Sequence, residues 1–298
     1  MEKSSFRIAP DPTHGFLRVD PTPSAEDVEK YYLNEFYTGE YKTFNDSELK
    51  VQQEQKDFFR LRYQFIHDQC EAHLGPLAGK TLLDIGCGYC QALLYFKERG
   101  LDVHGLEPSK EGADYGESHG IPVARAGIEN MPRDLGRKFD VVTLLNVLEH
   151  LREPARALVE IRERYLGKNG VLAIDVPNEY NDFQTTANKL HNLGEWWVAA
   201  PVHLNYFSPG SLRKLLEGCG YRVIGSEASF PLEMFLLWND VYVGNGALGG
   251  QVHKKRMAFE LNLVRNGKLD KLKKFYSALA DLELGRQVTM YATPADGS

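Results

Sequence analysis

A glycine-rich turn after a short apolar run is the part of this sequence best suited to chemistry. The turn contains Gly86 and Gly88, and Asp84 stands just before it. Glycine lets a backbone approach a ligand closely and adopt conformations that other residues avoid. The helix expected from Gln91 onward presents unpaired N–H groups at its start, where an anionic group can bind. A strand, a glycine turn and a helix in this order predict a nucleotide-type cofactor site.

The residues around the turn bear on which cofactor binds. The dinucleotide fingerprint has a third small residue, and this chain has Gln91 at that position. Asp84 would add negative charge beside a pyrophosphate, which disfavours NAD. An acid at this position suits a cationic ligand, such as an amino group.

A second acid, Glu107, follows the next expected strand, at roughly the 20-residue spacing from which an acid reaches a ribose. Its carboxylate can accept hydrogen bonds from both ribose hydroxyls. One acid for an amino group and one for a ribose together describe S-adenosylmethionine. An NAD-type oxidoreductase and a cofactor-binding protein without catalysis are the alternatives from other classes.

The pair Cys87 and Cys90 has the C-x-x-C spacing of zinc and redox sites. The chain has four cysteines and no second C-x-x-C pair, whereas a structural zinc site needs four ligands. We therefore expect these cysteines to be small packing residues and expect no metal. Free thiols, a polar N-terminus without a signal-peptide pattern and the absence of a long apolar run favour a cytoplasmic protein.

Strand and helix patterns alternate along the middle of the chain. Strands are expected at 81–85, 102–106, 122–124, 139–145, 171–176, 221–226 and 287–292, and helices at 91–99, 110–119, 154–166 and 209–218. This alternation predicts an α/β fold with a largely parallel sheet covered by helices on both faces.

The flanking segments differ in pattern from this core. Residues 1–75 are expected to form an N-terminal arm and helices, with an extended proline-containing arm at 1–23 and helices at 24–39 and 47–74. The first helix is rich in aromatics, and Tyr31, Tyr32 and Tyr37 are candidates for a lid over the cofactor. Residues 76–298 are expected to form the main domain, with a helical insertion at about 230–284 before the last strand.

The order of several short motifs resembles that of the class I S-adenosylmethionine-dependent methyltransferases. The matching segments are 83–88, 105–108, 128–132, 139–151 and 166–178, and the resemblance covers about 80–228 plus the last strand. It implies a Rossmann-like, mixed seven-stranded sheet with an antiparallel last strand. It also implies that the cofactor is bound by Asp84, Gly86, Cys87, Gly88, Glu107, Pro108, Ile128, Glu129 and Asn146. The family often has Asp where this chain has Gly127, so adenine is expected to meet a backbone carbonyl or Glu129.

His203 is the first candidate for the general base that removes the acceptor's proton. It lies between the fifth strand and the following helix, where loops line the cleft of such sheets. Its surroundings resemble a His-x-x-Tyr-Phe-Ser element of methyltransferases that modify sugars and other small metabolites. The alternative is a histidine that only fixes its loop.

His150 is the second candidate. Asn146, Glu149 and His150 are spaced so that one helical turn would bring them together. The run resembles the Glu-x-x-Glu-His element of quinone-biosynthesis O-methyltransferases, which can bind a divalent metal. Asn146 replaces the first Glu, which disfavours a metal here. Purely structural hydrogen bonding by Glu149 and His150 is the alternative.

Aromatic residues are candidates for the acceptor pocket, namely Tyr180, Trp196, Trp197 and Tyr206. Core packing is the alternative for each. The formal net charge of −6 gives no support to nucleic-acid binding. We expect a small-molecule O-methyltransferase with a histidine base, no nucleic-acid or membrane partner, and a possible homodimer. N- or C-methylation of a nucleotide-linked sugar or secondary metabolite is the alternative.

Overall fold

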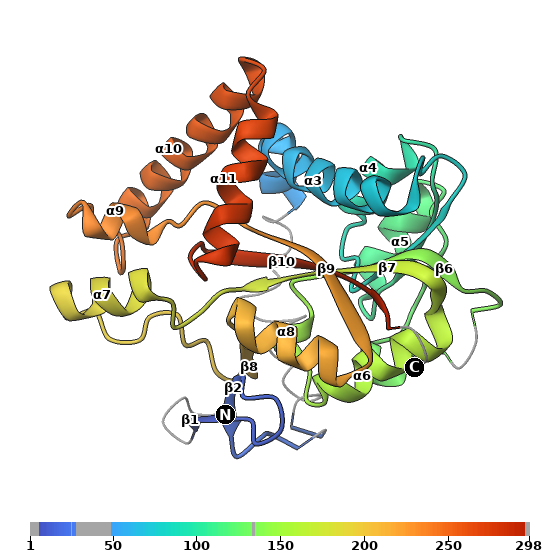
Figure 1. The fold of residues 1–298 in the computed structure, drawn as a ribbon, viewed down its shortest axis with the longest axis horizontal. Coiled ribbons are helices and arrows are strands. Elements are labelled where there is room, and N and C mark those ends of the chain that lie inside the picture. The colour runs from blue at the N-terminus through green and yellow to red at the C-terminus, as the bar shows by residue number, and fades with distance from the viewer. Residues whose placement is uncertain (1–5, 25, 28–48, 133–134, 296–298) are drawn as a thin grey trace.

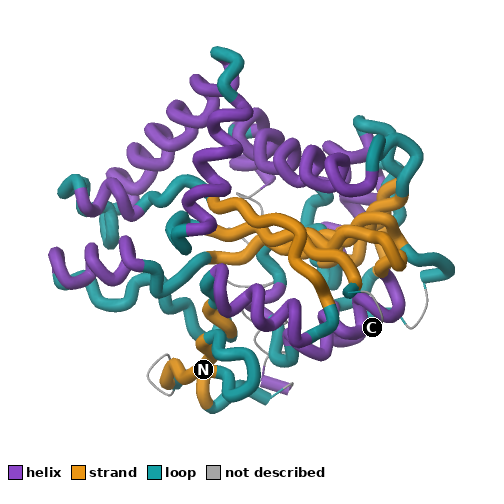
Figure 2. The backbone as a smooth tube through the Cα atoms, viewed as in Figure 1, coloured by secondary structure: helices purple, strands orange, loops and turns teal. Residues whose placement is uncertain are grey.

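A seven-stranded sheet forms the centre of the protein in a computed structural model, which describes residues 6–24, 26–27, 49–132 and 135–295 (Figures 1 and 2). The strands are β3 (Thr81–Ile85), β4 (Asp102–Leu106), β5 (Val123–Ala124), β6 (Phe139–Leu145), β7 (Leu166–Pro177), β9 (Tyr221–Ala228) and β10 (Gln287–Pro294). They lie in the order β5-β4-β3-β6-β7-β10-β9. The first five are parallel, and β10 runs antiparallel to both of its neighbours. The predicted mixed sheet is confirmed.

Alternate residues of the strands build two separate cores because successive side chains point to opposite faces. Leu82 packs with α3 (Lys56–Leu74), α4 (Gln91–Lys97) and α5 (Lys110–Ser118) on one face. Leu83 packs on the other face, with α6 (Pro154–Glu160) and α8 (Pro209–Gly218). The two helical layers lie on either side of the sheet in Figure 1. The sheet is therefore buried on both faces, as its apolar strands predict.

Two elements are longer or more irregular than the pattern predicts. The fifth strand was expected at 171–176, and β7 begins earlier, at Leu166, with a register shift against β6. The helix expected at 154–166 is α6 followed by a wider π-helical segment, Ile161–Tyr165. Neither difference moves the carboxyl ends of the strands, where the expected site lies.

The helical insertion consists of α9 (Glu233–Leu237), α10 (Gly246–Arg265) and α11 (Leu269–Asp281). Its apolar side chains pack with Leu61 and Phe65 of α3 in a third cluster. The same helix α3 buries Ile66 and Cys70 against the sheet. Helix α3 therefore joins the insertion to the sheet and packs directly on the main domain, although the sequence placed it in the N-terminal segment.

The N-terminal segment differs from the extended arm expected at 1–23. Residues Arg7–Pro10 (β1) and Leu17–Asp20 (β2) form an antiparallel hairpin, and β2 pairs with β8 (Asn205–Tyr206). This small sheet lies at the edge of the molecule near α8 (Figure 1). The sequence did not indicate the hairpin, because its strands are only four residues long and the segment is rich in proline. The helix expected at 24–39, with Tyr31, Tyr32 and Tyr37, lies almost entirely outside the described residues.

The carboxyl ends of the central strands carry the expected site. The glycine turn follows β3, Glu107 follows β4, and a 3-10 turn, η4 (Leu148–His150), follows β6. Another 3-10 turn, η3 (Ile128–Asn130), follows β5, and α7 (Asp182–His191) follows β7. In the described part of the chain, no helix combines the length and the apolar character needed to cross a membrane.

Candidate active site

The glycine turn after β3 is built around two left-handed glycines. Gly86 has φ 74° and Gly88 has φ 49°, conformations that glycine adopts at low cost. A Cβ on Gly86 would lie 2.6 Å from Val147 Cγ2, whereas a Cβ on Gly88 would meet no atom within 4 Å. Gly86 is therefore fixed by packing against the segment after β6. Gly88 has open space beside it.

Glu107 lies beside this turn and ties it to the next loop. Its Oε2 accepts a hydrogen bond from the Gly88 N–H at 2.9 Å, and its Oε1 accepts one from the Ser109 N–H at 2.9 Å. The side chain is buried. Each carboxylate oxygen can accept a second hydrogen bond. The structure thus leaves Glu107 able to take the ribose hydroxyls for which the sequence proposed it.

Asp84 lies deeper than expected. It is 3% exposed, and its Oδ1 accepts a hydrogen bond from the Thr143 hydroxyl at 2.6 Å. Burial raises the pKa of Asp84 to about 7, and the nearby Glu107 adds to this effect. Asp84 therefore has a structural partner beneath the turn. Its expected contact with the amino group of the cofactor stays a prediction.

The residues expected around adenine form the loop side of the site. Pro108 is exposed, and Ile128 is partly buried against the core of the sheet. Gly127 caps η3, and nothing lies within 4 Å of where its Cβ would stand. The Glu129 side chain falls outside the described part of the structure.

Asn146 takes a position that the proposed helical turn does not explain. It has φ 58°, lies before η4, and its Oδ1 accepts a hydrogen bond from Gln287 Nε2 at 3.3 Å. Gln287 in turn pairs with Arg62, which also reaches Asp175 Oδ2 at 3.1 Å. The single helical turn expected to gather Asn146 with Glu149 and His150 is therefore wrong. Asn146 has a left-handed conformation and lies before η4, so it is not part of the 3-10 turn that contains Glu149 and His150.

The cysteines of the C-x-x-C pair lie beneath the turn as neighbouring free thiols. Their Sγ atoms are 3.6 Å apart. A Cβ on Gly105 would meet Cys87 Sγ at 2.7 Å, and one on Gly116 would meet Cys90 Sγ at 2.8 Å. Both thiols fill the small spaces that these glycines leave, as expected of packing residues. The backbone N–H of Cys87, proposed as a cofactor residue, donates to Leu106 O at 3.2 Å.

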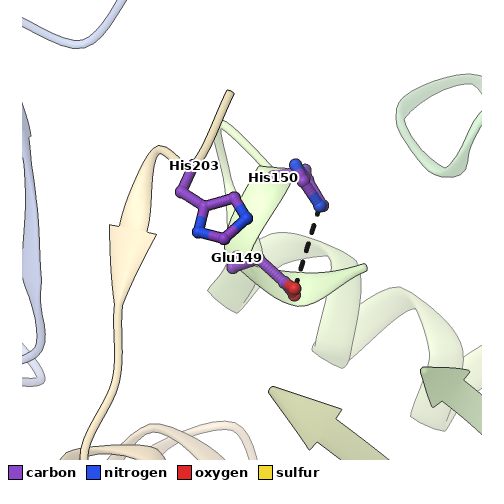
Figure 3. A group of neighbouring side chains, drawn as sticks. All are labelled: Glu149, His150 and His203. Atoms are coloured by element: carbon purple, nitrogen blue, oxygen red, sulfur yellow. Dashed lines mark ion pairs between the residues drawn. The ribbon is translucent and has the colours of Figure 1, made fainter. Parts of the chain in front are cut away.

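The structure brings the two candidate histidines together from distant segments. The rings of His150 and His203 meet edge to face with centroids 4.9 Å apart. His150 Nδ1 donates to the Val202 carbonyl at 2.8 Å, which leaves Nε2 as the acceptor, 3.8 Å from Glu149 Oε1. Figure 3 shows the two rings and the Glu149 carboxylate gathered at one point. The pairing of His150 and His203 was not predicted by their spacing.

Two buried acids surround this pair. Glu149 is 1% exposed, and both of its carboxylate oxygens lack a hydrogen-bond partner among the described residues. Burial raises its pKa well above the usual range. Glu179, which the sequence did not single out, lies with Oε1 4.0 Å from His203 Nδ1. The only sequence signal for Glu179 was its place just after the fifth strand.

The charges of the cluster follow from burial. The pKa of Glu179 is raised to about 8 by burial, with Arg286 opposing and Glu233 adding to the effect. Burial also lowers the pKa of His203 to about 3, helped by His150 and Arg286. Near neutral pH both groups are thus uncharged, and their 4.0 Å approach is a contact between neutral groups.

Glu149, His150 and His203 also form a donor set that a cation can use. One ligand atom from each lies within 4.8 Å of the other two. Two imidazoles and one carboxylate suit a transition metal better than Mg²⁺. The expectation that this protein uses no metal stays a prediction.

The aromatic residues proposed for the acceptor are packed together. Tyr180 meets Trp197 at 5.3 Å and Tyr206 at 6.1 Å between ring centroids, and Trp196 meets Trp197 at 4.7 Å. Trp197 and Tyr206 are buried, while Tyr180 and Trp196 keep partly exposed surfaces. The core-packing alternative therefore describes Trp197 and Tyr206, whereas Tyr180 and Trp196 stay partly exposed.

Comparisons with known proteins agree with this geometry. Residues 60–225, more than half of the chain, match the family model described as a methyltransferase domain. The ubiquinone biosynthesis O-methyltransferase of Idiomarina loihiensis is 30% identical over 189 residues, covering 56% of this chain and 72% of that protein. The tRNA U34 carboxymethyltransferase of Cronobacter sakazakii is 30% identical over 169 residues, covering 52% of this chain and 48% of that protein.

A solved structure shares the fold at low identity. The plantazolicin methyltransferase BpumL, in complex with a monoazolic desmethylPZN analog and SAH, superposes with a TM-score of 0.54 at 15% identity, covering 91% of this chain and 98% of that one. This likeness supports the fold alone.

The chain therefore belongs to the methyltransferase domain family. It is an S-adenosylmethionine-dependent methyltransferase. The resemblance stated from the motifs is confirmed, and the oxidoreductase alternative is set aside.

Asp84 makes the stability of the protein depend on pH. The folded state keeps the Asp84 proton up to about pH 7, whereas the unfolded chain loses it near pH 4, so stability falls as pH rises between these values. We expect Asp84→Asn to remove about 3 kcal/mol of the decline in unfolding free energy between pH 5 and 7.5. Urea unfolding at both pH values measures this.

The exposed Asp182→Asn variant is the matched control and should retain the wild-type decline. Equal declines in wild type and Asp84→Asn would contradict the raised pKa.

Proposed function

We propose that the protein transfers the methyl group of S-adenosylmethionine to a hydroxyl group of a small-molecule acceptor, with His203 as the general base. The observation that carries this proposal is the meeting of His203, His150, Glu149 and Glu179 beside the glycine turn. Val147 packs on Gly86, and His150 is only three residues further along the chain. Three residues span at most about 10 Å, so the cluster lies within reach of a methyl group on the cofactor.

The cofactor, when bound, supplies an activated methyl group on a sulfonium. The protein's own task is to hold the acceptor in line and to take its proton. The His203 ring is unprotonated near neutral pH, so its lone pair is free for a proton, and an ionised Glu179 beside it offsets the weak basicity that burial imposes. Its Nδ1 faces Glu179, which leaves Nε2 for the acceptor.

Glu179 supports the base in its ionised form. A carboxylate near Nδ1 fixes the tautomer of the ring and stabilises the imidazolium that forms during transfer. His150 holds the ring of His203 from the side and is fixed by its hydrogen bond to Val202 O. His150 is thus assigned to positioning, and His203 to proton transfer.

A hydroxyl acceptor and a small molecule fit the remaining evidence best. A neutral histidine is a suitable base for a hydroxyl, and the quinone-type relative is named as an O-methyltransferase. One relative is named for tRNA, but this chain has a net charge of −6, which disfavours a polyanionic partner. An N- or C-methylated product would contradict the proposal.

Replacing His203 tests the base directly. We expect His203→Ala to lower kcat/KM at least 100-fold, because general bases contribute about 10²–10⁴-fold, while S-adenosylmethionine affinity stays unchanged. Methyl transfer from ¹³C-methyl-labelled cofactor to catechols and nucleotide-linked sugars, followed by NMR, reports both the rate and the atom methylated.

The exposed His73→Ala variant is the matched control. A loss of less than tenfold would overturn the assignment of His203. The assays include EDTA after dialysis, and activity that requires an added divalent metal would overturn the metal-free scheme.

Glu179 predicts how activity changes with pH. Because the ionised form supports His203 and the pKa of Glu179 is about 8, kcat/KM should rise with pH through about 8. Glu179→Gln should flatten this rise. It should also lower kcat/KM above pH 8 by about tenfold or more, because the variant lacks the carboxylate that stabilises the protonated base. The charged neighbours of Glu179 are Arg286 and Glu233, and both remain in the variant.

The measurement is a pH–rate profile of each protein, with the exposed Glu153→Gln as control. A rise through pH 8 that persists in Glu179→Gln would assign it to another group.

A further inference from the structure

A groove of about 380 Å³ lies between the N-terminal hairpin and the loop before β8. Six of its lining residues are apolar or aromatic, namely Phe6, Ile8, Leu17, Tyr180, Val198 and Ala200. Their side chains are partly exposed, apart from the buried Ala200, so the groove has an apolar wall open to solvent. Its volume is within the range of small-molecule sites.

We propose that this groove binds the part of the acceptor remote from the methylated hydroxyl, and that this part is an aromatic ring carrying a cationic amine. The inference rests on the proposed function for its link to methyl transfer.

The charge of the groove favours a cation. Glu195 and Arg7 are its charged lining residues. Arg7 Nη2 pairs with Asp20 Oδ2 at 2.5 Å, so Arg7 already has an acidic partner. Glu195 is exposed and accepts a hydrogen bond from the Tyr180 hydroxyl at 3.2 Å, and no cation of the described residues pairs with it. A ligand amine can therefore supply the missing positive charge.

Tyr180 provides a preformed wall for a ring. Its φ of 61° is uncommon for a bulky residue, and such conformations persist only where the surroundings impose them. Trp197 and Tyr206 hold the Tyr180 ring edge to face. A fixed aromatic face with a carboxylate at its hydroxyl end suits an aromatic amine, through ring contact and a charge-assisted hydrogen bond.

The groove lies within one small molecule's length of the base. Tyr180 lines it and directly follows Glu179, which faces His203. Ala200 also lines it, three residues before His203, and the N–H groups of Val202 and His203 both donate to Ala199 O. Three residues span at most about 10 Å. Two separate segments thus each carry a groove residue next to a residue of the catalytic cluster.

Isothermal titration calorimetry with two matched probes tests the groove. Phenethylamine should bind the wild-type protein, and 3-phenylpropionate, a phenyl probe of opposite charge, should bind at least tenfold more weakly. Glu195→Gln should weaken phenethylamine binding at least fivefold, and Glu195→Lys should abolish it. Ile8→Trp should abolish binding by filling the groove, and Val198→Trp repeats this from the opposite wall if Ile8→Trp fails to fold.

Binding of both probes with equal affinity, or phenethylamine binding unchanged in Glu195→Gln and in both tryptophan variants, would overturn the proposal. His203→Ala separates this failure from that of the proposed function. If the groove is as proposed, phenethylamine binds His203→Ala as it binds the wild type, whether or not His203 is the base.

Discussion

The proposed cofactor site depends on the carboxylate of Glu107. Its two oxygens accept the N–H groups of Gly88 and Ser109, and this bridge fixes the glycine turn after β3 against the loop after β4. Parallel pairing of these strands brings both loops to the same edge of the sheet. Because the side chain is buried, these charge-assisted hydrogen bonds offset the cost of removing a carboxylate from water. A ligand at the turn therefore meets an acceptor that is already oriented.

The proposed catalytic cluster takes its position from the same turn. Val147 packs on Gly86, so the segment after β6 is fixed beside the glycine turn. Glu149 and His150 belong to this segment. His203 belongs to a distant segment just before β8, and its ring contacts His150. The N-terminal hairpin pairs with β8 and so fixes this segment. Burial lowers the pKa of both histidines and keeps their rings neutral. Three contacts between distant segments thus bring these side chains together.

The sequence predicted the sheet and the glycine turn well because both rest on local patterns. The apolar run at 81–85, the glycines after it and Glu107 each act through neighbours in the chain or in adjacent strands. The cluster was predicted only in part. His150 and His203 were each identified from motifs, but their contact depends on the path of the 199–206 loop. Glu179 belongs to no motif with a recognisable spacing. The hairpin at 7–20 was missed because its strands are only four residues long and because its second strand pairs with β8, which lies far along the chain.

Calorimetric titration of S-adenosylmethionine into wild-type protein and Glu107→Gln tests the cofactor site most directly. An amide oxygen can keep only one of the two backbone hydrogen bonds and carries no charge for the ribose hydroxyls. The structure predicts that the wild type binds S-adenosylmethionine and not NAD, that Glu107→Gln weakens binding at least tenfold, about 1.4 kcal/mol, and that the exposed Glu111→Gln does not. Equal affinity of Glu107→Gln and wild type, or tighter binding of NAD, would contradict the account.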